Sequence, residues 1–328
     1  MDTQTPGTMV LSLDLELSWG RFDHTSTNVL DAEALKERTS IKRLLALLDQ
    51  FDIPATWAMV GHLMLDGCAR DQDGTAHADI TPHARYSWFP YDWYHHDPCT
   101  TAAAAPGWYA PDILEWIREA RARHEIGSHS FAHICYGDPE CSPSVARADL
   151  KAAVEAAVQN GITLKSFVFP RNQVGHLEIL KSFGLSAYRG RSIRMSEPTF
   201  HLWGSRVFLR VLGFVDQLLA LSPRQVRAEE VLPGLWNIPG NHCYMPRDRM
   251  NRVIPMASRV FKGKRGINWA VRTGGLYHLW FHPFDLNVDS DAMLSGLEKI
   301  FSYAHEMRKK RLLHILTMEQ YVQRLRNS

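Results

Sequence analysis

Two histidines stand four residues apart in the stretch HSFAH, which holds His129 and His133 with Ser130 between them. Side chains at positions i and i+4 of a helical turn share one face, so both imidazoles could reach a single metal ion. The chain has 16 histidines, so an HxxxH pair by itself is weak evidence for a metal site. Asp14 and Glu16 strengthen it, because they lie two apart and share one face of an expected strand. Two neutral imidazoles, a carboxylate and an open position for water are typical of a catalytic zinc site.

The acidic pair lies in a segment with the pattern of a buried strand. Five apolar residues surround the two acids: Val10, Leu11, Leu13, Leu15 and Leu17. An unpaired carboxylate is costly in such surroundings, which favours a functional role for the pair over a solvated edge strand.

Apolar segments with strand character alternate along the chain with amphipathic segments of helical spacing. Strands are predicted at 8–17, 53–61, 164–170, 235–239, 275–281 and 312–316, with a further strand directly before His129. Helices are predicted at 31–51, 112–123, 143–161 and 289–310. This alternation predicts an α/β fold with a parallel sheet, and about seven or eight such units in one chain favour a barrel. We expect a single catalytic domain over residues 1–328.

Polar residues follow several of the expected strands, where the active sites of parallel α/β barrels lie. They are Asp14 and Glu16, His129 and His133, Arg171 and Asn172, Asn241 and His242, and His282. We expect these five segments to converge on one mouth, with Asn241 and His242 lining the substrate site. His278 lies in the middle of a strand and is expected to be a packed histidine.

The long segment 66–111 breaks the strand–helix alternation and is expected to be a functional insertion. Within it, the stretch YSWFPYDWYHHD at 86–97 is rich in aromatic residues. We predict that it overhangs the site and that Trp88 and Trp93 stack on sugar rings, the alternative being a satellite hydrophobic cluster. Trp19 is a further candidate for a sugar platform, although the core is the commoner place for a tryptophan.

Composition excludes several classes of protein. The 37 basic and 35 acidic residues give a net charge of +2, so nothing calls for a nucleic-acid partner. The sequence has no uninterrupted run of about 18 apolar residues, the length needed to span a membrane, and no signal sequence is evident at the N-terminus. The five cysteines form no CxxC pair, which favours a reducing cytoplasm over a disulfide framework.

The blocks SLDLE, HSFAH and LWFH resemble the conserved blocks of the polysaccharide deacetylases of carbohydrate esterase family 4. His129, Ser130 and His133 match H-[ST]-x-x-H, Leu279 and His282 match L-x-x-H, and LTMEQY at 316–321 is similar to the closing turn of the family. The resemblance implies a distorted (β/α) barrel of about seven units. It also implies metal-dependent hydrolysis of N-acetyl groups.

The resemblance also implies roles for the site residues. Glu16, His129 and His133 would hold a divalent metal, expected to be zinc, which acidifies water and polarises the amide carbonyl. Asp14 would be the general base and His282 the general acid. Asp14 and Glu16 could exchange roles, or both could bind metal.

Two departures from the family pattern bear on function. The acids form D-x-E rather than two adjacent aspartates, which resembles the subgroup of deacetylases and deformylases acting on cell-surface sugars. The arginine expected to orient the base, Arg171, follows the proline of FVFPRNQ rather than preceding it, so Asn172 and Gln173 are alternatives.

The expected substrate is an N-acetylated or N-formylated amino sugar on a nucleotide or lipid carrier, used in the cytoplasm for surface-polysaccharide or lipopolysaccharide assembly. Arg189 and Arg191 could grip a phosphate or a sugar carboxylate, or be solvated surface. Two other functions stay open. The chain could hydrolyse a small nonsugar amide, as allantoinase-like relatives of the fold do, or be a noncatalytic sugar-binding barrel.

Overall fold

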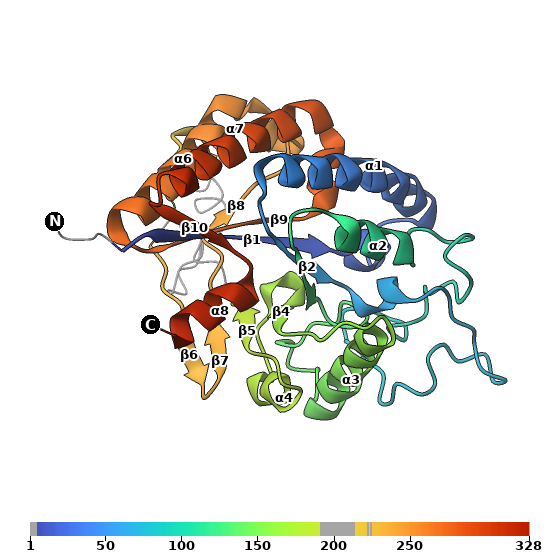
Figure 1. Ribbon diagram of the computed structural model, residues 1–328. Helices are drawn as coiled ribbons and strands as arrows, with labels where there is room; N and C mark the ends of the chain where they lie inside the picture. The colour runs from blue at the N-terminus through green and yellow to red at the C-terminus, as the bar shows by residue number, and fades with distance from the viewer. Residues whose placement is uncertain (1–4, 191–213, 222, 224, 328) are drawn as a thin grey trace, which may run out of the picture.

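One ten-stranded sheet organises the chain in the computed structural model, which describes residues 5–190, 214–221, 223 and 225–327 (Figure 1). Its strands are β1 (Gly7–Leu15), β2 (Thr56–Met59), β3 (Glu125–Ser128), β4 (Ser166–Val168), β5 (Ala187–Arg189), β6 (Glu229–Leu232), β7 (Leu235–Asn237), β8 (His242–Cys243), β9 (Leu276–Phe281) and β10 (Leu313–Leu316). Their order across the sheet is β6-β7-β5-β4-β3-β2-β1-β9-β8, with β10 paired to β1.

The central strand β1 has three partners. The first half of one of its edges pairs with β10 and the second half with β2, while β9 pairs along the other edge. Every pairing is parallel except that of β6 with β7. Within the described ranges no ladder joins β8 to β6, so the sheet curls without closing. The prediction of a distorted (β/α) barrel is confirmed.

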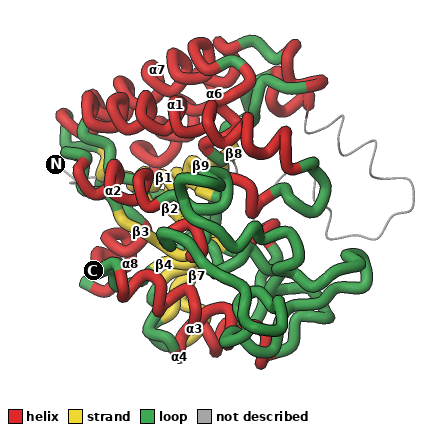
Figure 2. Tube along the Cα trace, turned by 90° about the vertical axis from the view of Figure 1, so that its right-hand side faces the viewer, coloured by secondary structure: helices red, strands yellow, loops and turns green. Residues whose placement is uncertain are grey.

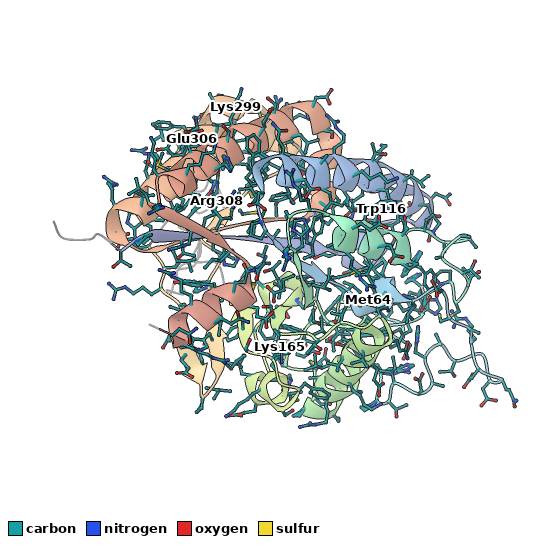
Figure 3. All side chains as sticks on the ribbon, in the orientation of Figure 1. Met64, Trp116, Lys165, Lys299, Glu306 and Arg308 are labelled. Atoms are coloured by element: carbon teal, nitrogen blue, oxygen red, sulfur yellow. The ribbon has the colours of Figure 1, made fainter. Side chains whose placement is uncertain are left out.

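Helices cover the outside of the curled sheet. Figure 1 shows α1 (Thr27–Phe51), α6 (Met256–Thr273) and α7 (Ser290–Lys309) over one side of β1, with α3 (Pro143–Gln159), α4 (Leu177–Ser182) and α8 (Met318–Arg326) on the opposite side. The short helix α2 (Pro111–Glu119) lies near α1. Charged side chains such as Lys299 and Glu306 extend from the exposed face of α7 (Figure 3), while its apolar residues pack inward.

The helix α6 was not predicted from the sequence, and its composition explains why. Its buried face includes Arg259 and Lys262, which interrupt the apolar pattern. Small residues replace apolar ones at the contacts with the sheet, since a Cβ at Gly266 would lie 2.4 Å from the ring of Tyr277. The strands and helices that the sequence did predict are confirmed, with ends within a few residues of the expected ones.

The carboxyl ends of the parallel strands open onto a loop-rich side of the molecule. Figure 2 shows the loops gathered there, on the side of the sheet away from both termini. The insertion 66–111 contributes much of this region and contains turns and isolated bridges but, before α2 begins at Pro111, no helix or named strand. Among the described residues, no helix has the length and apolar character needed to cross a membrane.

Candidate active site

The carboxyl ends of β1, β3 and β9 bring the predicted metal ligands together. Asp14 is the penultimate residue of β1 and Glu16 follows its end, and both are almost completely buried. Oε1 of Glu16 lies 2.9 Å from Nε2 of His129 and 3.2 Å from Nε2 of His133. Nε2 of His282 lies 3.5 Å from the same Glu16 oxygen. Four side chains from three strand ends thus meet at one carboxylate oxygen.

The HSFAH segment is a loop rather than the helical turn expected from its spacing. Ser130 and His133 both adopt left-handed backbone angles, with φ of 67° and 59°. The hydroxyl of Ser130 accepts a hydrogen bond from the backbone N–H of Ile134 at 3.0 Å. The loop therefore turns both imidazoles towards Glu16 by a different route from the predicted one.

Hydrogen-bond accounting at His129 supports a cation site. Its Nδ1 lies 2.7 Å from the carbonyl oxygen of Val168, which can only accept, so Nδ1 carries the proton. In the neutral ring, Nε2 then directs a lone pair at the carboxylate of Glu16, and two acceptors at this distance repel unless a cation lies between them. Metal-ligating histidines commonly donate their other ring N–H to a backbone carbonyl in this way. The residues present therefore fit a divalent ion held by Glu16, His129 and His133.

The surroundings keep Glu16 ionised although it is buried. Burial alone would raise the pKa of its carboxyl, but the facing His133 and His282 hold that pKa well below the ordinary value. Burial lowers the pKa of His133, which favours the neutral imidazole that a metal requires. Gly20 leaves room for the carboxylate, because a Cβ there would lie 1.8 Å from Oε2 of Glu16.

Arg189, at the end of β5, holds the second acid of the pair. Its guanidinium donates to both oxygens of Asp14, at 2.7 and 2.6 Å, and is itself almost completely buried. Burial would raise the pKa of Asp14, but Arg189 holds it below the ordinary value. Because Arg189 is occupied in this way, the prediction that it grips a substrate phosphate is wrong. Arg191 lies outside the described residues.

The prediction that Arg171 orients the base is also wrong. Arg171 has φ of 54°, and its guanidinium pairs with Asp23 at 2.5 Å. Asn172, one alternative, follows it with φ of 54°, and among the described residues neither Oδ1 of Asn172 nor Oε1 of Gln173, the other alternative, has a hydrogen-bond partner. The backbone turns away after β4, so the arginine that reaches Asp14 comes instead from the neighbouring strand β5.

A chain of hydrogen bonds continues behind Asp14. Arg189 also donates to the hydroxyl of Ser12 at 3.0 Å, and this hydroxyl lies 2.9 Å from Nε2 of His278. Nδ1 of His278 faces the carbonyl of Ile238, so Nε2 accepts from Ser12. Burial and Arg189 lower the pKa of His278 to about 3. The prediction that His278 is a packed histidine is confirmed.

His282 follows β9 and is the most exposed of these side chains. Its Nε2 lies 3.7 Å from Oδ2 of Asp14, and its Nδ1 lies 3.2 Å from Oδ2 of Asp285. Burial would lower its pKa, but Glu16, Asp285 and Asp14 raise the pKa of His282 to about 10. These acids therefore favour the protonated imidazole, which is able to donate a proton.

Asp149 on α3 supports the HSFAH loop and was not identified from the sequence. Its carboxylate accepts hydrogen bonds from the backbone N–H groups of Phe131 and Ala132, at 2.9 and 3.2 Å. It also accepts from the hydroxyl of Tyr136 at 2.9 Å. An aspartate on an amphipathic helix carries no sequence signal for such a role, because its partners are backbone groups of another segment.

Replacing Asp149 by Asn is expected to weaken metal binding at Glu16, His129 and His133 by about 10–100-fold. The amide loses one acceptor oxygen, so the loop that carries both histidines is held less firmly. Metal affinity is measured by competition with a chelator. Glu155→Gln, an exposed carboxylate-to-amide change on the same helix, is the control, and an unchanged affinity for Asp149→Asn would contradict the prediction.

Glu37 on α1 is a buried acid behind the site. Neither of its carboxyl oxygens has a hydrogen-bond partner among the described residues. Burial, only partly offset by Arg21, raises the pKa of Glu37 to about 8. The folded protein therefore holds this proton over a pH range in which the unfolded chain releases it.

The contribution of Glu37 to wild-type stability is expected to fall as the pH rises from about 4.5 to about 8, because this group binds less proton in the unfolded state than in the folded state there. Glu37→Gln should flatten this dependence and stabilise the protein at the alkaline end. The free energy of unfolding is measured across this window at constant metal concentration. Glu155→Gln, an exposed change on α3, should leave the wild-type slope unaltered, and a parallel slope in Glu37→Gln would contradict the assignment.

The structure separates the predicted sugar-binding tryptophans. Trp19 and Trp93 are only 1% exposed, so neither can stack on a sugar, and the alternatives hold: Trp19 lies in the core and Trp93 in a hydrophobic cluster. Trp19 packs edge-on against Trp108, and the indole of Trp93 donates to the carbonyl of Ala132 in the HSFAH loop. Trp88 is 44% exposed, and the guanidinium of Arg171 lies 5.0 Å from its ring centroid. Of the three, only Trp88 reaches the surface, and Tyr86 stacks on its ring with centroids 5.0 Å apart.

The predicted pair Asn241 and His242 does not line the site. Asn241 bonds to the backbone of β9 through both ends of its amide, and His242 is buried with Nδ1 2.6 Å from the hydroxyl of Tyr277. Burial lowers the pKa of His242 to about 3. Both residues join the short edge strand β8 and the residue before it to β9. In the sequence, a polar residue after a strand looks the same whether it has this structural role or a binding role.

Comparison with known proteins identifies the fold. No protein-family model and no curated protein sequence matches the chain. A protein from Mycobacterium smegmatis described as a polysaccharide deacetylase matches with a TM-score of 0.62 and 16% identity, over 100% of this chain and 92% of the other. A second protein described as a polysaccharide deacetylase, from Pseudomonas aeruginosa PAO1, matches with a TM-score of 0.58 and 11% identity, over 96% of this chain and 89% of the other. The PuuE allantoinase matches with a TM-score of 0.58 and 12% identity, over 98% of this chain and 91% of the other. The chain therefore has the polysaccharide deacetylase fold.

Proposed function

We propose that this protein is a metal-dependent hydrolase that removes the N-acyl group from an amino sugar. One observation carries the proposal: Asp14, Glu16, His129, His133 and His282 converge at one edge of a deacetylase-type sheet. The two acids are held differently, since Glu16 faces the histidines and Asp14 is clamped by Arg189. This difference supports distinct roles for the two carboxylates.

Glu16, His129 and His133 would hold the ion, expected to be zinc because one carboxylate and two imidazoles suit it. When bound, such an ion polarises an amide carbonyl and acidifies water. Asp14 lies beside this position with both oxygens ordered by Arg189, and would accept a proton from the attacking water.

His282 lies across from the ligands and would donate a proton to the departing amine. Asp285 orients its ring through Nδ1, leaving Nε2 directed towards the two acids. The partial exposure of His282 places this proton where a substrate entering from solvent can receive it.

The proposed substrate is an N-acetylated or N-formylated amino sugar on a nucleotide or lipid carrier. The D-x-E arrangement of Asp14 and Glu16 supports it by resemblance to deacetylases and deformylases of cell-surface sugars. Trp88 supports it physically, because the part of its indole that Tyr86 and Arg171 leave uncovered would contact a pyranose ring. We include in this proposal that the enzyme acts in surface-polysaccharide or lipopolysaccharide assembly.

The likeness to an allantoinase favours a second candidate. Its TM-score equals that of one of the deacetylases, so the fold alone does not separate a sugar N-acyl group from a small ureide. A noncatalytic sugar-binding barrel is less favoured, because it would not require a buried arginine to clamp a buried aspartate next to the metal ligands.

The test is a substrate panel with the zinc-loaded enzyme: nucleotide-linked and lipid-linked N-acetyl and N-formyl sugars, chitin oligomers and allantoin. Release of acetate or formate with an equal amount of free amine from a carrier-linked sugar supports the proposal. His129→Ala, tested in parallel, excludes a contaminating enzyme. Turnover of allantoin alone supports the second candidate, and release from chitin alone overturns the carrier-linked substrate.

A further inference from the structure

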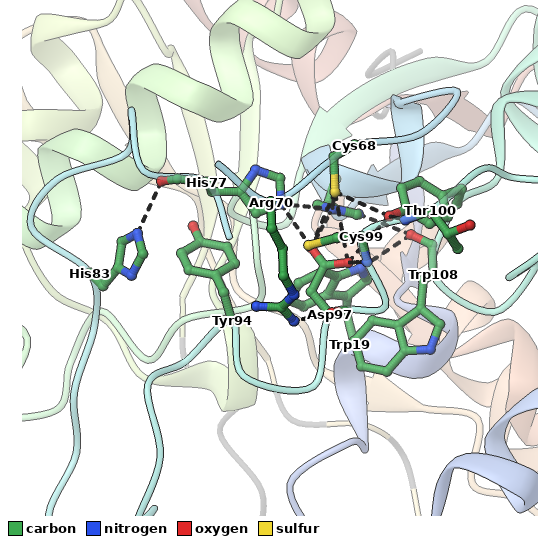
Figure 4. Close-up of polar contacts among 12 residues, drawn as sticks. Trp19, Cys68, Arg70, His77, His83, Tyr94, Asp97, Cys99, Thr100 and Trp108 are labelled. Atoms are coloured by element: carbon green, nitrogen blue, oxygen red, sulfur yellow. Dashed lines mark hydrogen bonds and ion pairs between the residues drawn. The ribbon is translucent and has the colours of Figure 1, made fainter. Parts of the chain in front are cut away.

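A second group of metal-type side chains lies in the insertion, apart from the candidate active site. His62, Cys68, His77 and Asp97 place one donor atom each within 4.8 Å of one another. Figure 4 labels three of them, Cys68, His77 and Asp97. His62 belongs to the short helix Gly61–Met64 after β2, and the other three belong to the insertion. His62 and Asp97 are almost completely buried. The four residues are spread over 36 positions of a segment with little regular secondary structure, and only the tertiary structure joins them.

The donor atoms lie close enough together to surround one zinc ion, with separations both below and above those of an ideal tetrahedral site. For zinc bonds of ordinary length, tetrahedral geometry separates two nitrogens by about 3.3 Å and a nitrogen from a sulfur by about 3.6 Å. Nε2 of His62 lies 3.1 Å from Nε2 of His77 and 2.9 Å from Oδ2 of Asp97, and His77 lies 2.7 Å from that oxygen. Sγ of Cys68 lies 3.6 Å from the same oxygen and 3.9 Å from Nε2 of His62.

Hydrogen bonds do not account for this cluster while the ring of His62 is neutral. Nδ1 of His62 lies 3.0 Å from the carbonyl oxygen of Trp108, so it carries the proton of the neutral ring. Nε2 of His62 then directs a lone pair at the carboxylate of Asp97, which is also an acceptor. An N–H at Nε2 of His77 can donate to either acceptor. The contact between Nε2 of His62 and Oδ2 of Asp97 still joins two acceptors and stays repulsive. His129 and Glu16 show the same arrangement at the first centre.

The other oxygen of Asp97 is already occupied. Oδ1 accepts hydrogen bonds from the hydroxyl of Tyr109 at 3.2 Å and from the backbone N–H of Cys99 at 3.0 Å. These contacts leave Oδ2 directed at the two imidazoles. Oriented ligands with their remaining atoms hydrogen-bonded are typical of built metal sites.

We propose that His62, Cys68, His77 and Asp97 bind a structural zinc ion that holds the insertion against the barrel. Two imidazoles, a thiolate and a carboxylate are ligands that zinc accepts, and four protein ligands leave no open position for substrate in a cluster of two buried and two partly buried residues. The insertion has few backbone ladders to stabilise it, so a cross-link between its two ends and the helix after β2 contributes directly to its folding.

The zinc also supports the first centre indirectly. His62 packs on Trp19, with ring centroids 4.6 Å apart, and Trp19 lies in the turn that follows Glu16. Four residues before Asp97, the indole of Trp93 donates to the carbonyl of Ala132 between the two histidine ligands of the first centre. Loss of the zinc should therefore loosen the packing beneath Glu16 and the HSFAH loop.

Cobalt substitution tests the proposal, because a thiolate ligand gives Co²⁺ an intense charge-transfer absorption in the near ultraviolet. The first centre contains no sulfur ligand, so this absorption reports the second centre alone. The full-length protein should bind two equivalents of Zn²⁺ or Co²⁺ and show the thiolate band. Cys68→Ser should lose the band, retain one tightly bound equivalent and melt at a lower temperature.

Two further variants make the result decisive. Cys99→Ser, which removes the neighbouring thiol, should keep the band and both equivalents. His129→Ala should keep the band but lose one equivalent, so failure of the first centre is distinguishable from failure of the second. The proposal is overturned if the wild-type protein takes up one equivalent without a thiolate band, if Cys99→Ser loses the band, or if mass spectrometry shows a Cys68–Cys99 disulfide. The wild-type titration decides the matter even where Cys68→Ser does not fold.

Discussion

Replacing His282 by Ala is expected to lower kcat on the true substrate by about 10²–10⁴-fold, the usual contribution of a general acid. Nε2 of His282 faces the two acids of β1, and no other histidine of the described chain except the ligands lies at Glu16. Metal content should stay at the wild-type value, because Glu16, His129 and His133 complete a three-ligand set without it.

Asp285→Asn separates a catalytic role of His282 from a structural one. The carboxylate of Asp285 raises the pKa of His282, so its loss should lower that pKa and move the alkaline limb of the kcat/KM profile to lower pH. Activity at the acidic end should be largely kept. If His282→Ala loses metal in proportion to activity, His282 is a ligand rather than the acid; an unchanged rate removes it from the mechanism.

Arg189→Ala is expected to cost about 3–5 kcal/mol of stability, since it leaves the buried carboxylate of Asp14 without its partner. It should also lower kcat, because Asp14 loses both hydrogen bonds that order it. Without the guanidinium the pKa of Asp14 rises, so the acidic limb of the kcat/KM profile should move to higher pH. Thermal unfolding and the pH profile measure the two effects independently.

Arg189→Lys is the informative second variant. Lysine keeps the charge but cannot donate to both oxygens of a carboxylate in a fixed plane, so stability should recover more than kcat. Arg171→Lys is the matched control at the arginine that the sequence favoured, and it should change kcat little because Arg171 pairs with Asp23. A larger loss of kcat in Arg171→Lys than in Arg189→Lys would reverse the assignment.

The sequence was sufficient for features that local pattern controls. The apolar alternation around Asp14 and Glu16 predicted a buried strand, and β1 is that strand, with Asp14 in it and Glu16 directly after its end. Helical spacing predicted α1, α3 and α7, whose apolar faces pack on the sheet. The meeting of Glu16, His129, His133 and His282 also followed from sequence, because parallel strands place their carboxyl ends at one edge.

Side-chain partners reached across the sheet were decided only by the tertiary structure. The order of strands places β5 where Arg189 can reach Asp14, while left-handed backbone angles turn Arg171 away towards Asp23. Trp19 and Trp93 were equally visible in the sequence, but their burial depends on how the insertion folds back on the barrel.

The cluster of His62, Cys68, His77 and Asp97 shows the same limit most clearly. Its ligands follow none of the short, regular spacings that mark metal sites in a sequence, because they lie on a segment without helical or strand periodicity. Sequence thus determined the elements and the strand-end ligands, where chain geometry fixes side-chain direction over a few residues. Contacts between irregular segments depend on the path of the whole loop, and only the folded chain specifies that path.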